Sequence, residues 1–557
     1  MSHLRQGYGG QGVRQGYGVT GSWWPPALAL VIAVALAGFG LTRGTRAVGG
    51  SDSSCYGLMA EAFGTGHWQP SSALAVEAPW PDASRTLAPG GFLPSPVRPD
   101  AASPICAPGF SVLMAPFYAI GGRDAIFAVT PIAAFVLVWC AFVLANRLAG
   151  GLAGVAAAAL TASSPIVLFQ AVQPMNDIAT AALWLAALAV ATGVGRGGSS
   201  TFARRATADR SDPPATARAV LAGLLIGLAI LVRPNLAPLA AIVVGMTVSD
   251  TLPKSAYGAK NRTQWWWSVV LVMAGTLPGV AALLWLNHVL YGSVAGNGYG
   301  DVGQLFSVSN IGVNAANYGR ALYQTQTVFP LAALAAPLVL TGEARRVSLW
   351  LLAFAGAVGG IYLLYRSFPE WWYIRFLIPA LVVTIVVACS VASRIADRGR
   401  MRGVVAIGTV ALALMGIQTA GARQVLALQG LEGRYRETAD LVAARLPANA
   451  VLITVWQSGS VRFHAGREAV LWDSLDPAWL DRAVAWLSAQ GRAPYILVER
   501  REEAEFRDRF RGQAEIGALD WPPRFNIGGQ ARIFDPADRL RYLAGEAYAT
   551  DNIRRVR

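Results

Sequence analysis

The feature that most constrains this chain is a series of long apolar runs along its first 420 positions. A helix of about 20 mainly apolar residues crosses the hydrocarbon core of a bilayer. The runs that reach or approach this length are 27–42, 125–147, 151–172, 177–195, 266–290, 328–341, 348–365, 376–393 and 403–420. Residues 109–121 form a shorter apolar run. The chain is therefore predicted to be an α-helical polytopic membrane protein.

Composition supports this class. Hydrophobic residues make up 54% of the chain and charged residues only 14%, with a mean hydropathy of +0.42. A soluble domain has about 25% charged residues, so a soluble enzyme, a disordered chain and a disulfide-rich secreted module are excluded. The net charge of +14 lies in short clusters between apolar runs, which is the pattern of membrane topology. No nucleic-acid partner is expected. Residues 1–26 are predicted to be a flexible cytoplasmic tail.

The stretch 219–249 allows two interpretations, because Arg233-Pro234-Asn235 interrupts its apolar run. Proline breaks the helical hydrogen-bond ladder, so the stretch forms either one kinked helix or a hairpin with Arg233 at its tip. The hairpin gives about 11 spans and, with the N-terminus inside, places nearly every dense basic cluster in the cytoplasm, as the positive-inside rule requires. We therefore favour the hairpin. The clusters are Arg147, 196–218, 254–262, 345–346 and 394–402.

Three segments then face the non-cytoplasmic side: 43–108, 291–327 and everything after about 421. The last segment holds 18 of the 32 acidic residues and alternates between strand and helix patterns. Expected helices are 437–446, 477–490 and 502–511; expected strands are 450–456 and 495–500. The chain thus divides into a transmembrane domain, 27–420, with the outer loop 43–108, and a C-terminal soluble α/β domain, 421–557.

Four charged residues near the outer membrane face are candidates for function, because charges there are costly. Asp52 lies beyond the first span and precedes a pattern typical of a short amphipathic helix at the interface; Asp177 opens the fourth span. Each carboxylate suits either proton transfer or a helix N-cap. Arg233 and Arg375 suit a phosphate; the alternative, and the commoner role for a lone arginine here, is a snorkelling or interfacial anchor.

The cysteines and histidines indicate no metal site. Cys55 and Cys106 lie near the two ends of the first outer loop. They either form a disulfide, if that compartment is oxidising, or remain free thiols. The four histidines have no metal-ligand spacing.

The order of several segments resembles a known family. After the first span and Asp52 come APGFSVLMAPFYAIGG, SSPIVLFQAVQPMND, AGLLIGLAILVRPN and RFLIPAL. Over about 27–393 this order is similar to the polyprenyl-phosphate-sugar-dependent glycosyltransferases of the GT-C fold, which include protein O-mannosyltransferases and lipid A aminoarabinose transferases. One departure is that the protein mannosyltransferases carry an Asp-Glu pair where this chain has Asp52 and Ser53.

The resemblance implies transfer of a sugar, with inversion, from a polyprenyl-phosphate donor to a lipid, glycan or protein acceptor of a bacterial cell envelope. Asp52 would be the general base, Asp177 would support base or acceptor, and Arg233 and Arg375 would hold the donor phosphate. A divalent metal is compatible with the family, although the missing second carboxylate weakens that expectation. The expected location is the plasma (inner) membrane, with the C-terminal domain periplasmic or extracellular.

Two other functions compete with this one. A transporter or flippase of a lipid-linked sugar would more often show internal repeats and ionisable residues at mid-membrane, and this sequence shows neither. A non-catalytic membrane scaffold that presents 421–557 predicts that Asp52 is dispensable. The sequence therefore favours the glycosyltransferase.

Overall fold

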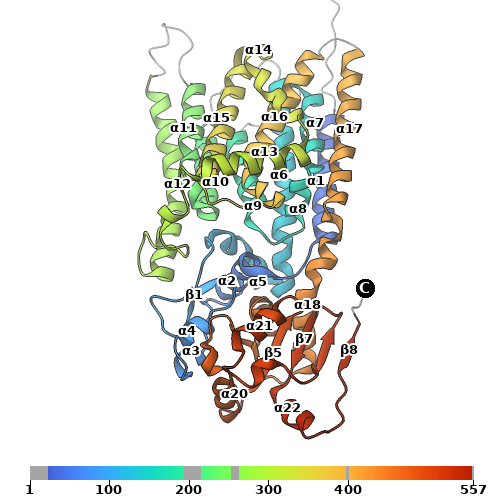
Figure 1. The fold of residues 1–557 in the computed structure, drawn as a ribbon. Coiled ribbons are helices and arrows are strands. Elements are labelled where there is room, and N and C mark those ends of the chain that lie inside the picture. Colours follow the sequence, from blue (N-terminus) through green and yellow to red (C-terminus); the bar gives the residue numbers. More distant parts are fainter. Residues whose placement is uncertain (1–22, 194–214, 252–261, 397–399, 555–557) are drawn as a thin grey trace, which may run out of the picture.

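A computed structural model of the protein describes residues 23–193, 215–251, 262–396 and 400–554. Most of the expected tail 1–26 lies outside these residues. So do the basic residues of 196–210, Lys254, Lys260 and Arg398. The described part has a helical bundle and a C-terminal domain that covers one end of it (Figure 1). We call that end of the bundle the domain side.

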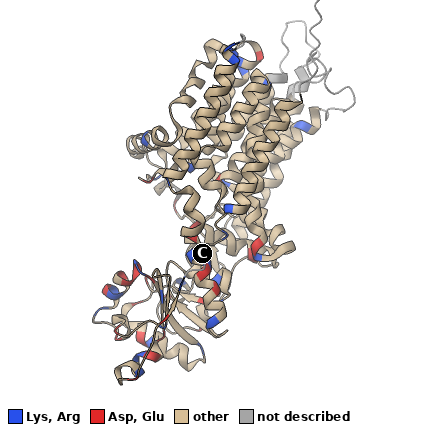
Figure 2. Ribbon diagram, turned by 90° about the vertical axis from the view of Figure 1, so that its right-hand side faces the viewer, with Lys and Arg blue, Asp and Glu red and all other residues tan. Residues whose placement is uncertain are grey.

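The helical bundle confirms the membrane class. Its helices are α1 (Trp24–Arg43), α5 (Gly109–Ala125), α6 (Val129–Ala149), α7 (Gly151–Ala162), α8 (Pro165–Ala171), α9 (Asn176–Ala191), α10 (Ala215–Val232), α11 (Leu239–Thr251), α12 (Arg262–Tyr291), α13 (Asn310–Gln326), α14 (Ala336–Val339), α15 (Gly342–Leu364), α16 (Ile378–Ile395) and α17 (Arg400–Ala422). The protein is a multi-pass membrane protein. Figure 2 shows few charged residues in the bundle and many in the C-terminal domain.

The expected count of about 11 spans is not confirmed. Among the described residues, seven helices are long and apolar enough to cross a membrane, or eight if α7 and α8 form one span bent by 62°. The bend lies at Ser163–Pro165, where Pro165 starts α8. Three further apolar helices, α9, α11 and the segment Phe329–Val339, are shorter.

Residues 219–249 form a hairpin rather than one kinked helix. α10 ends at Val232, the 3₁₀ turn Pro234–Leu236 follows, and α11 begins at Leu239. Proline at the first position of this turn suits its fixed φ and missing N–H. Arg233 therefore lies at the tip, as the charge pattern predicted.

Contacts at the two ends of the hairpin fix its direction. At the open end, Arg218 donates to the carbonyl of Gly193 after α9, and Arg346 near the start of α15 donates to the carbonyl of Ser249 at 2.9 Å. At the tip, Asn235 donates to the Tyr362 hydroxyl near the end of α15 at 3.1 Å. α10 thus runs towards the domain side and α11 runs back.

α10 and α12 pack backbone to backbone through two pairs of glycines. A Cβ on Gly223 would lie 2.1 Å from the Val272 carbonyl oxygen, and one on Gly279 would lie 2.3 Å from the Gly227 carbonyl carbon. Gly275 makes an equally close approach to Val220. Small residues four apart allow membrane helices to approach in this way, because lipid offers no hydrophobic drive for their association.

The C-terminal domain contains a mixed sheet in the order β4-β3-β5-β7-β6-β8. β3 is parallel to both β4 and β5, whereas β7 is antiparallel to β5 and β6. The strands are β3 (Ala450–Ile453), β4 (Glu468–Val470), β5 (Ala493–Glu499), β6 (Phe525–Ile527), β7 (Ala531–Phe534) and β8 (Asp551–Ile553). The helices of eight or more residues are α18 (Leu428–Arg445), α20 (Leu480–Ala489), α21 (Glu502–Phe510) and α22 (Pro536–Leu543).

The α/β prediction for this domain is confirmed. The two expected strands are β3 and β5, and the three expected helices are α18, α20 and α21. The sequence pattern missed β4, β6, β7 and β8, which have three or four residues each. β3 is as short, but the apolar run AVLITVW that contains it made it visible. So short a strand shows no measurable alternation.

The outer loop 43–108 packs into the C-terminal domain. It carries α2 (Gly50–Gly64), α3 (Leu74–Glu77), α4 (Ala83–Thr86) and the hairpin of β1 (Phe92–Pro94) with β2 (Ala102–Pro104). Leu74, Trp80 and Leu87 share a hydrophobic core with residues of the sheet and of α20 and α21. The Thr86 carbonyl accepts a hydrogen bond from the Leu471 N–H. Loop and domain therefore form one unit over the domain side.

Candidate active site

Asp52 lies in the first turn of α2, which is buried rather than spread on an interface. Its residues Ser53 to Ala60 are all buried. On one flank α2 packs against α5, and on the other its Ser54 touches Gly459 of the C-terminal domain, where a Cβ would lie 1.9 Å from the Ser54 hydroxyl oxygen. The expected amphipathic interfacial helix is therefore wrong, because the C-terminal domain covers the face that would have met lipid headgroups.

Neither candidate carboxylate caps its helix. The N-cap of α2 is Gly49 and that of α9 is Met175, and neither cap has a side-chain hydrogen bond. Asp52 and Asp177 point instead to arginines. Asp177 is almost completely buried, with 1% of its side chain exposed, and its Oδ1 accepts a hydrogen bond from Arg233 at 2.7 Å. The N-cap interpretation of both residues is wrong.

Arg375 joins the two carboxylates. Its Nη2 donates to Asp52 Oδ2 at 2.9 Å, and its Nε lies 4.0 Å from Asp177 Oδ2. Together with the Arg233–Asp177 pair this gives an alternating row: Asp52, Arg375, Asp177, Arg233. Asp177 Oδ2 and Arg375 Nε are buried and have no hydrogen-bond partner in the structure. The four residues that the sequence singled out thus meet in one place.

Aromatic rings hold the two guanidiniums. Arg233 lies 5.0 Å from the ring centre of Phe376 and 5.6 Å from that of Tyr362, and Arg375 lies 5.2 Å from the ring centre of Phe376. A guanidinium stacks on such faces because it is planar and weakly hydrated. Only 15% of the Arg375 side chain is exposed, so it is not an interfacial anchor.

A cavity of about 210 Å³ opens beside this row on the domain side. Three elements of the transmembrane domain line most of it: the start of α2, the turn before α9, and the 3₁₀ helix Trp371–Leu377 before α16. Asp52 and Arg375 supply its charge from these elements, and Trp372 and Tyr373 supply aromatic surface. Glu432 of α18 lines it from the C-terminal domain. Charged and aromatic groups at such a pocket suit the binding and reaction of a polar ligand.

A disulfide holds the lining helix in place. Cys55 of α2 is bonded to Cys106, and both are buried. The bridge ties together the two ends of the outer loop across 51 positions of sequence, which stabilises the loop mainly by restricting the unfolded chain. Of the two sequence alternatives for these cysteines, the structure has the disulfide. Asp52 lies three residues from it.

The charges at the site do not fit a divalent metal. Each carboxylate already faces a guanidinium, at 2.9 Å and 2.7 Å, so a cation placed between them would meet two positive charges. No group of three or more potential metal-ligating side chains occurs within the described residues. Arginine is therefore the electrophilic element that the described residues of this site offer.

Comparison with known proteins identifies the fold. No protein-family model and no curated protein matches the sequence. Among solved structures, ArnT from Cupriavidus metallidurans bound to undecaprenyl phosphate matches with a TM-score of 0.53 at 15% identity, over 86% of this chain and 94% of ArnT. The archaeal oligosaccharyltransferase AglB from Archaeoglobus fulgidus, in complex with an inhibitory peptide and a dolichol-phosphate, matches at 0.50 and 12% identity, over 89% and 72%. The protein has the GT-C fold.

Within this GT-C fold, sequence reasoning missed several residues that line the cavity. Gln173 and Trp372 lie only a few positions from Asp177 and Arg375. The sequence motifs around Asp177 and Arg375 could therefore have identified them as lining residues. No sequence motif identifies Glu432 as a lining residue, because it lies 380 positions after Asp52 in a domain whose docking the sequence does not reveal.

Proposed function

We propose that this protein is a glycosyltransferase that moves a sugar from a polyprenyl-phosphate donor to a cell-envelope acceptor. The observation that carries the proposal is the alternating row of two carboxylates and two arginines beside a cavity on the domain side of a GT-C fold. A lipid-linked donor reacts where lipid headgroup and water meet, and its phosphate ester supplies the leaving group. The site accordingly needs a base and cations, but no nucleotide-binding loop.

Arg375 and Arg233 would hold the donor phosphate. Both carry permanent positive charge in a partly dehydrated place, where a guanidinium binds phosphate with two hydrogen bonds. Of these two arginines, Arg375 is the more available to bind a donor phosphate. It shares its charge between Asp52 and the more distant Asp177, whereas Arg233 is tied to Asp177 at 2.7 Å. These cations stabilise the negative charge that develops on the leaving phosphate.

Asp52 would then act as the general base. The acceptor oxygen or nitrogen attacks the anomeric carbon from the face opposite the phosphate, and the bond from carbon to phosphate oxygen breaks. The electron pair leaves with the phosphate, giving a polyprenyl phosphate, and the acceptor proton passes to Asp52. One displacement of this kind inverts the anomeric carbon.

The Asp52–Arg375 ion pair suggests how donor binding prepares the base. A donor phosphate that takes up the Arg375 guanidinium competes with Asp52 for it, since both are anions. Asp52 is thereby released to accept a proton only when a donor is present. Asp177 serves a different role, because it is buried against both arginines and orients them.

The proposed location is the plasma (inner) membrane of a bacterium, with the domain side outward. The described basic residues Arg147, Arg218, Arg345 and Arg394 lie at the helix ends opposite the C-terminal domain, so the positive-inside rule places that end in the cytoplasm. Cysteine-accessibility labelling at Val76, a residue of the outer loop that is 61% exposed, tests this orientation, and labelling from the cytoplasmic side would contradict it.

Mass spectrometry of cell-envelope glycans in a deletion strain tests the function. The strain is complemented with wild type, Asp52→Asn or Asp100→Asn, at matched expression. Asp100 is the matched control, because it belongs to the same loop and pairs with Arg98 on the surface. Loss of a general base lowers rates by about 10²- to 10⁴-fold, so Asp52→Asn should lose the transferred sugar and Asp100→Asn should retain it. Wild-type levels in Asp52→Asn would exclude Asp52 as the base.

A further inference from the structure

Glu432 reaches the active-site cavity from a domain that the proposed chemistry does not otherwise use. It lies in the second turn of α18, and 29% of its side chain is exposed. The rest of the cavity lining comes from the transmembrane domain and its outer loop. The C-terminal domain therefore closes one wall of the cavity, and the charged group on that wall is Glu432.

The position of α18 is fixed by close contacts beside Asp52. The Tyr435 ring lies against Gly49, where a Cβ would be 2.2 Å from Tyr435 Cδ2, so only glycine fits. The Val48 N–H donates to His464 Nε2 at 3.1 Å, and Arg436 of α18 donates to Asp124 of α5 at 2.6 Å. The wall that carries Glu432 thus docks directly onto the segment that carries the base.

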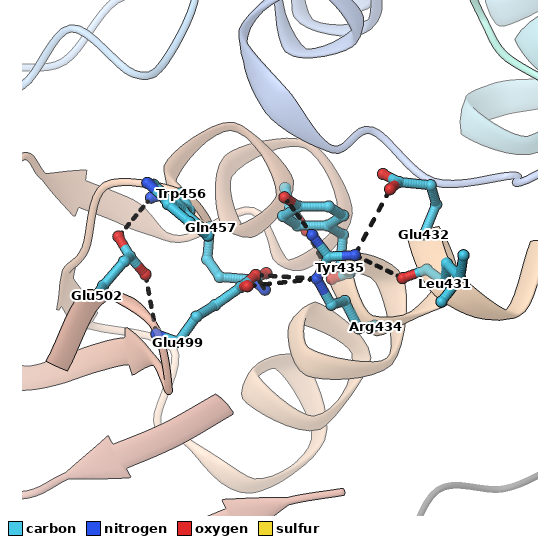
Figure 3. A network of polar contacts seen from close by, with 9 residues as sticks. Leu431, Glu432, Arg434, Tyr435, Trp456, Gln457, Glu499 and Glu502 are labelled. Atoms are coloured by element: carbon cyan, nitrogen blue, oxygen red, sulfur yellow. Dashed lines mark hydrogen bonds and ion pairs between the residues drawn. The ribbon is translucent and has the colours of Figure 1, made fainter. Parts of the chain in front are cut away.

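A polar network behind Glu432 makes this wall rigid (Figure 3). Arg434 Nε donates to both oxygens of Glu499 at 3.2 and 3.3 Å, and its Nη2 donates to the Tyr435 hydroxyl at 2.8 Å. Gln457 donates to Glu499 at 2.8 Å. Glu502 accepts the N–H groups of Trp456 and Glu499 at 3.0 and 2.9 Å, and burial raises the pKa of Glu502 to about 7. These hydrogen bonds hold the buried side chains in one arrangement, and among these described residues Gln457 Oε1 is the atom left without a partner.

Glu432 stands at the edge of this network rather than in its centre. Its Oε1 lies 3.5 Å from Arg434 Nη1, a longer contact than those that Arg434 makes with Glu499. Because Arg434 Nη1 already donates to the Leu431 carbonyl at 2.6 Å and Arg434 Nε donates to Glu499, the Glu432 carboxylate keeps capacity to accept further hydrogen bonds. Burial raises the pKa of Glu432 as well, with Arg434 opposing the shift. In Figure 3, Glu432 lies on the side of the network nearest the blue ribbon of the outer loop.

We infer that Glu432 is an acceptor-contacting residue, which receives a hydrogen bond from a hydroxyl or amine of the acceptor and so completes the acceptor half of the site. This inference rests on the proposed glycosyl transfer. It assigns one part of the cavity to each substrate. The arginines of the transmembrane domain bind the anionic donor, and a carboxylate of the C-terminal domain accepts a hydrogen bond from the acceptor. The C-terminal domain then takes part in acceptor selection.

The test compares three variants at matched expression in the complemented deletion strain: Glu432→Gln, Asp440→Asn and Glu499→Gln. Asp440 is the matched control on the same helix, because it is exposed, pairs with Arg436 at 3.7 Å and does not line the cavity. Glu499→Gln tests a purely structural role, since Glu499 is the stronger partner of Arg434. A polyprenyl phosphate is titrated into each purified full-length protein to measure donor-site binding separately.

We expect Glu432→Gln to lower glycan transfer by roughly tenfold to a hundredfold, the loss of one charged hydrogen bond. Polyprenyl phosphate binding should be unchanged in this variant, and Asp440→Asn should match wild type in both measurements. Wild-type transfer in Glu432→Gln would overturn the inference. So would a fall in the melting temperature of Glu432→Gln as large as that of Glu499→Gln, or a loss of lipid binding in Glu432→Gln, because Glu432 would then act through the fold. Failure of the proposed function looks different: the wild-type protein itself would bind no polyprenyl phosphate, and the deletion would leave envelope glycans unchanged.

Discussion

Breaking the buried Asp177–Arg233 pair should destabilise the protein, and removing both charges should largely restore it. The side chains are 1% and 12% exposed and meet at 2.7 Å. Removal of one partner from such a pair costs about 3–5 kcal/mol, because the other charge stays buried and uncompensated. Replacement of both by apolar residues of similar volume is often neutral. We therefore expect Asp177→Leu and Arg233→Met each to lose about 3–5 kcal/mol and the double variant to lose much less.

The geometry also predicts the order of the single variants. Asp177 faces two guanidiniums, at 2.7 and 4.0 Å, whereas Asp177 is the one ion-pair partner of Arg233 among the described residues. Asp177→Leu leaves the positive charges of Arg233 and Arg375 close together with less negative charge beside them. Its loss of stability should therefore lie near the upper end of that range. Arg233→Met should lie near the lower end, because Asp177 still has Arg375 nearby.

Thermal unfolding of the purified protein in detergent measures these effects through tryptophan fluorescence. The Arg98–Asp100 pair is the control: at 2.6 Å it is as short, but its side chains are 47% and 36% exposed. Its double-variant cycle should give a coupling energy of at most about 1 kcal/mol, against about 3 kcal/mol or more for the buried pair. Additive losses at Asp177 and Arg233 would refute the argument. The restored double variant should still transfer no sugar, because the Arg233 charge is gone.

Two further predictions concern the docking of the C-terminal domain. Gly49→Ala should lower thermal stability and transfer, because its Cβ would overlap the Tyr435 ring; Tyr435→Ala in the same chain should relieve part of the loss, and strictly additive effects would contradict the clash. Burial, together with the neighbouring charge of Arg436, lowers the pKa of His464 to about 4, and its neutral ring accepts the Val48 N–H. Because the folded protein binds this proton more weakly than the unfolded chain, stability should fall as pH drops from about 6.5 to 4, by up to about 3 kcal/mol. His464→Gln should flatten that part of the pH profile, and an unchanged profile would contradict the assignment.

Much of the fold could be predicted because its signals are local. Lipid requires about 20 apolar residues in a row, so the longest spans were visible in the sequence. The break at Arg233-Pro234 followed from proline chemistry and the charge pattern. The count of spans was not predictable in the same way. Neighbouring helices bury most of α9 and part of α11, so the length of such helices depends on packing as well as on the thickness of a bilayer.

The sequence by itself also determined which charges were candidates, since a mostly apolar chain leaves few of them near one membrane face. Only the tertiary structure decided what they do. It turned Asp52 and Asp177 from helix caps into partners of Arg375 and Arg233, and it brought Glu432 to the same cavity. The physical reason is that ion pairing, burial and cavity walls depend on distances between segments that lie tens to hundreds of residues apart, and composition and periodicity carry no record of those distances.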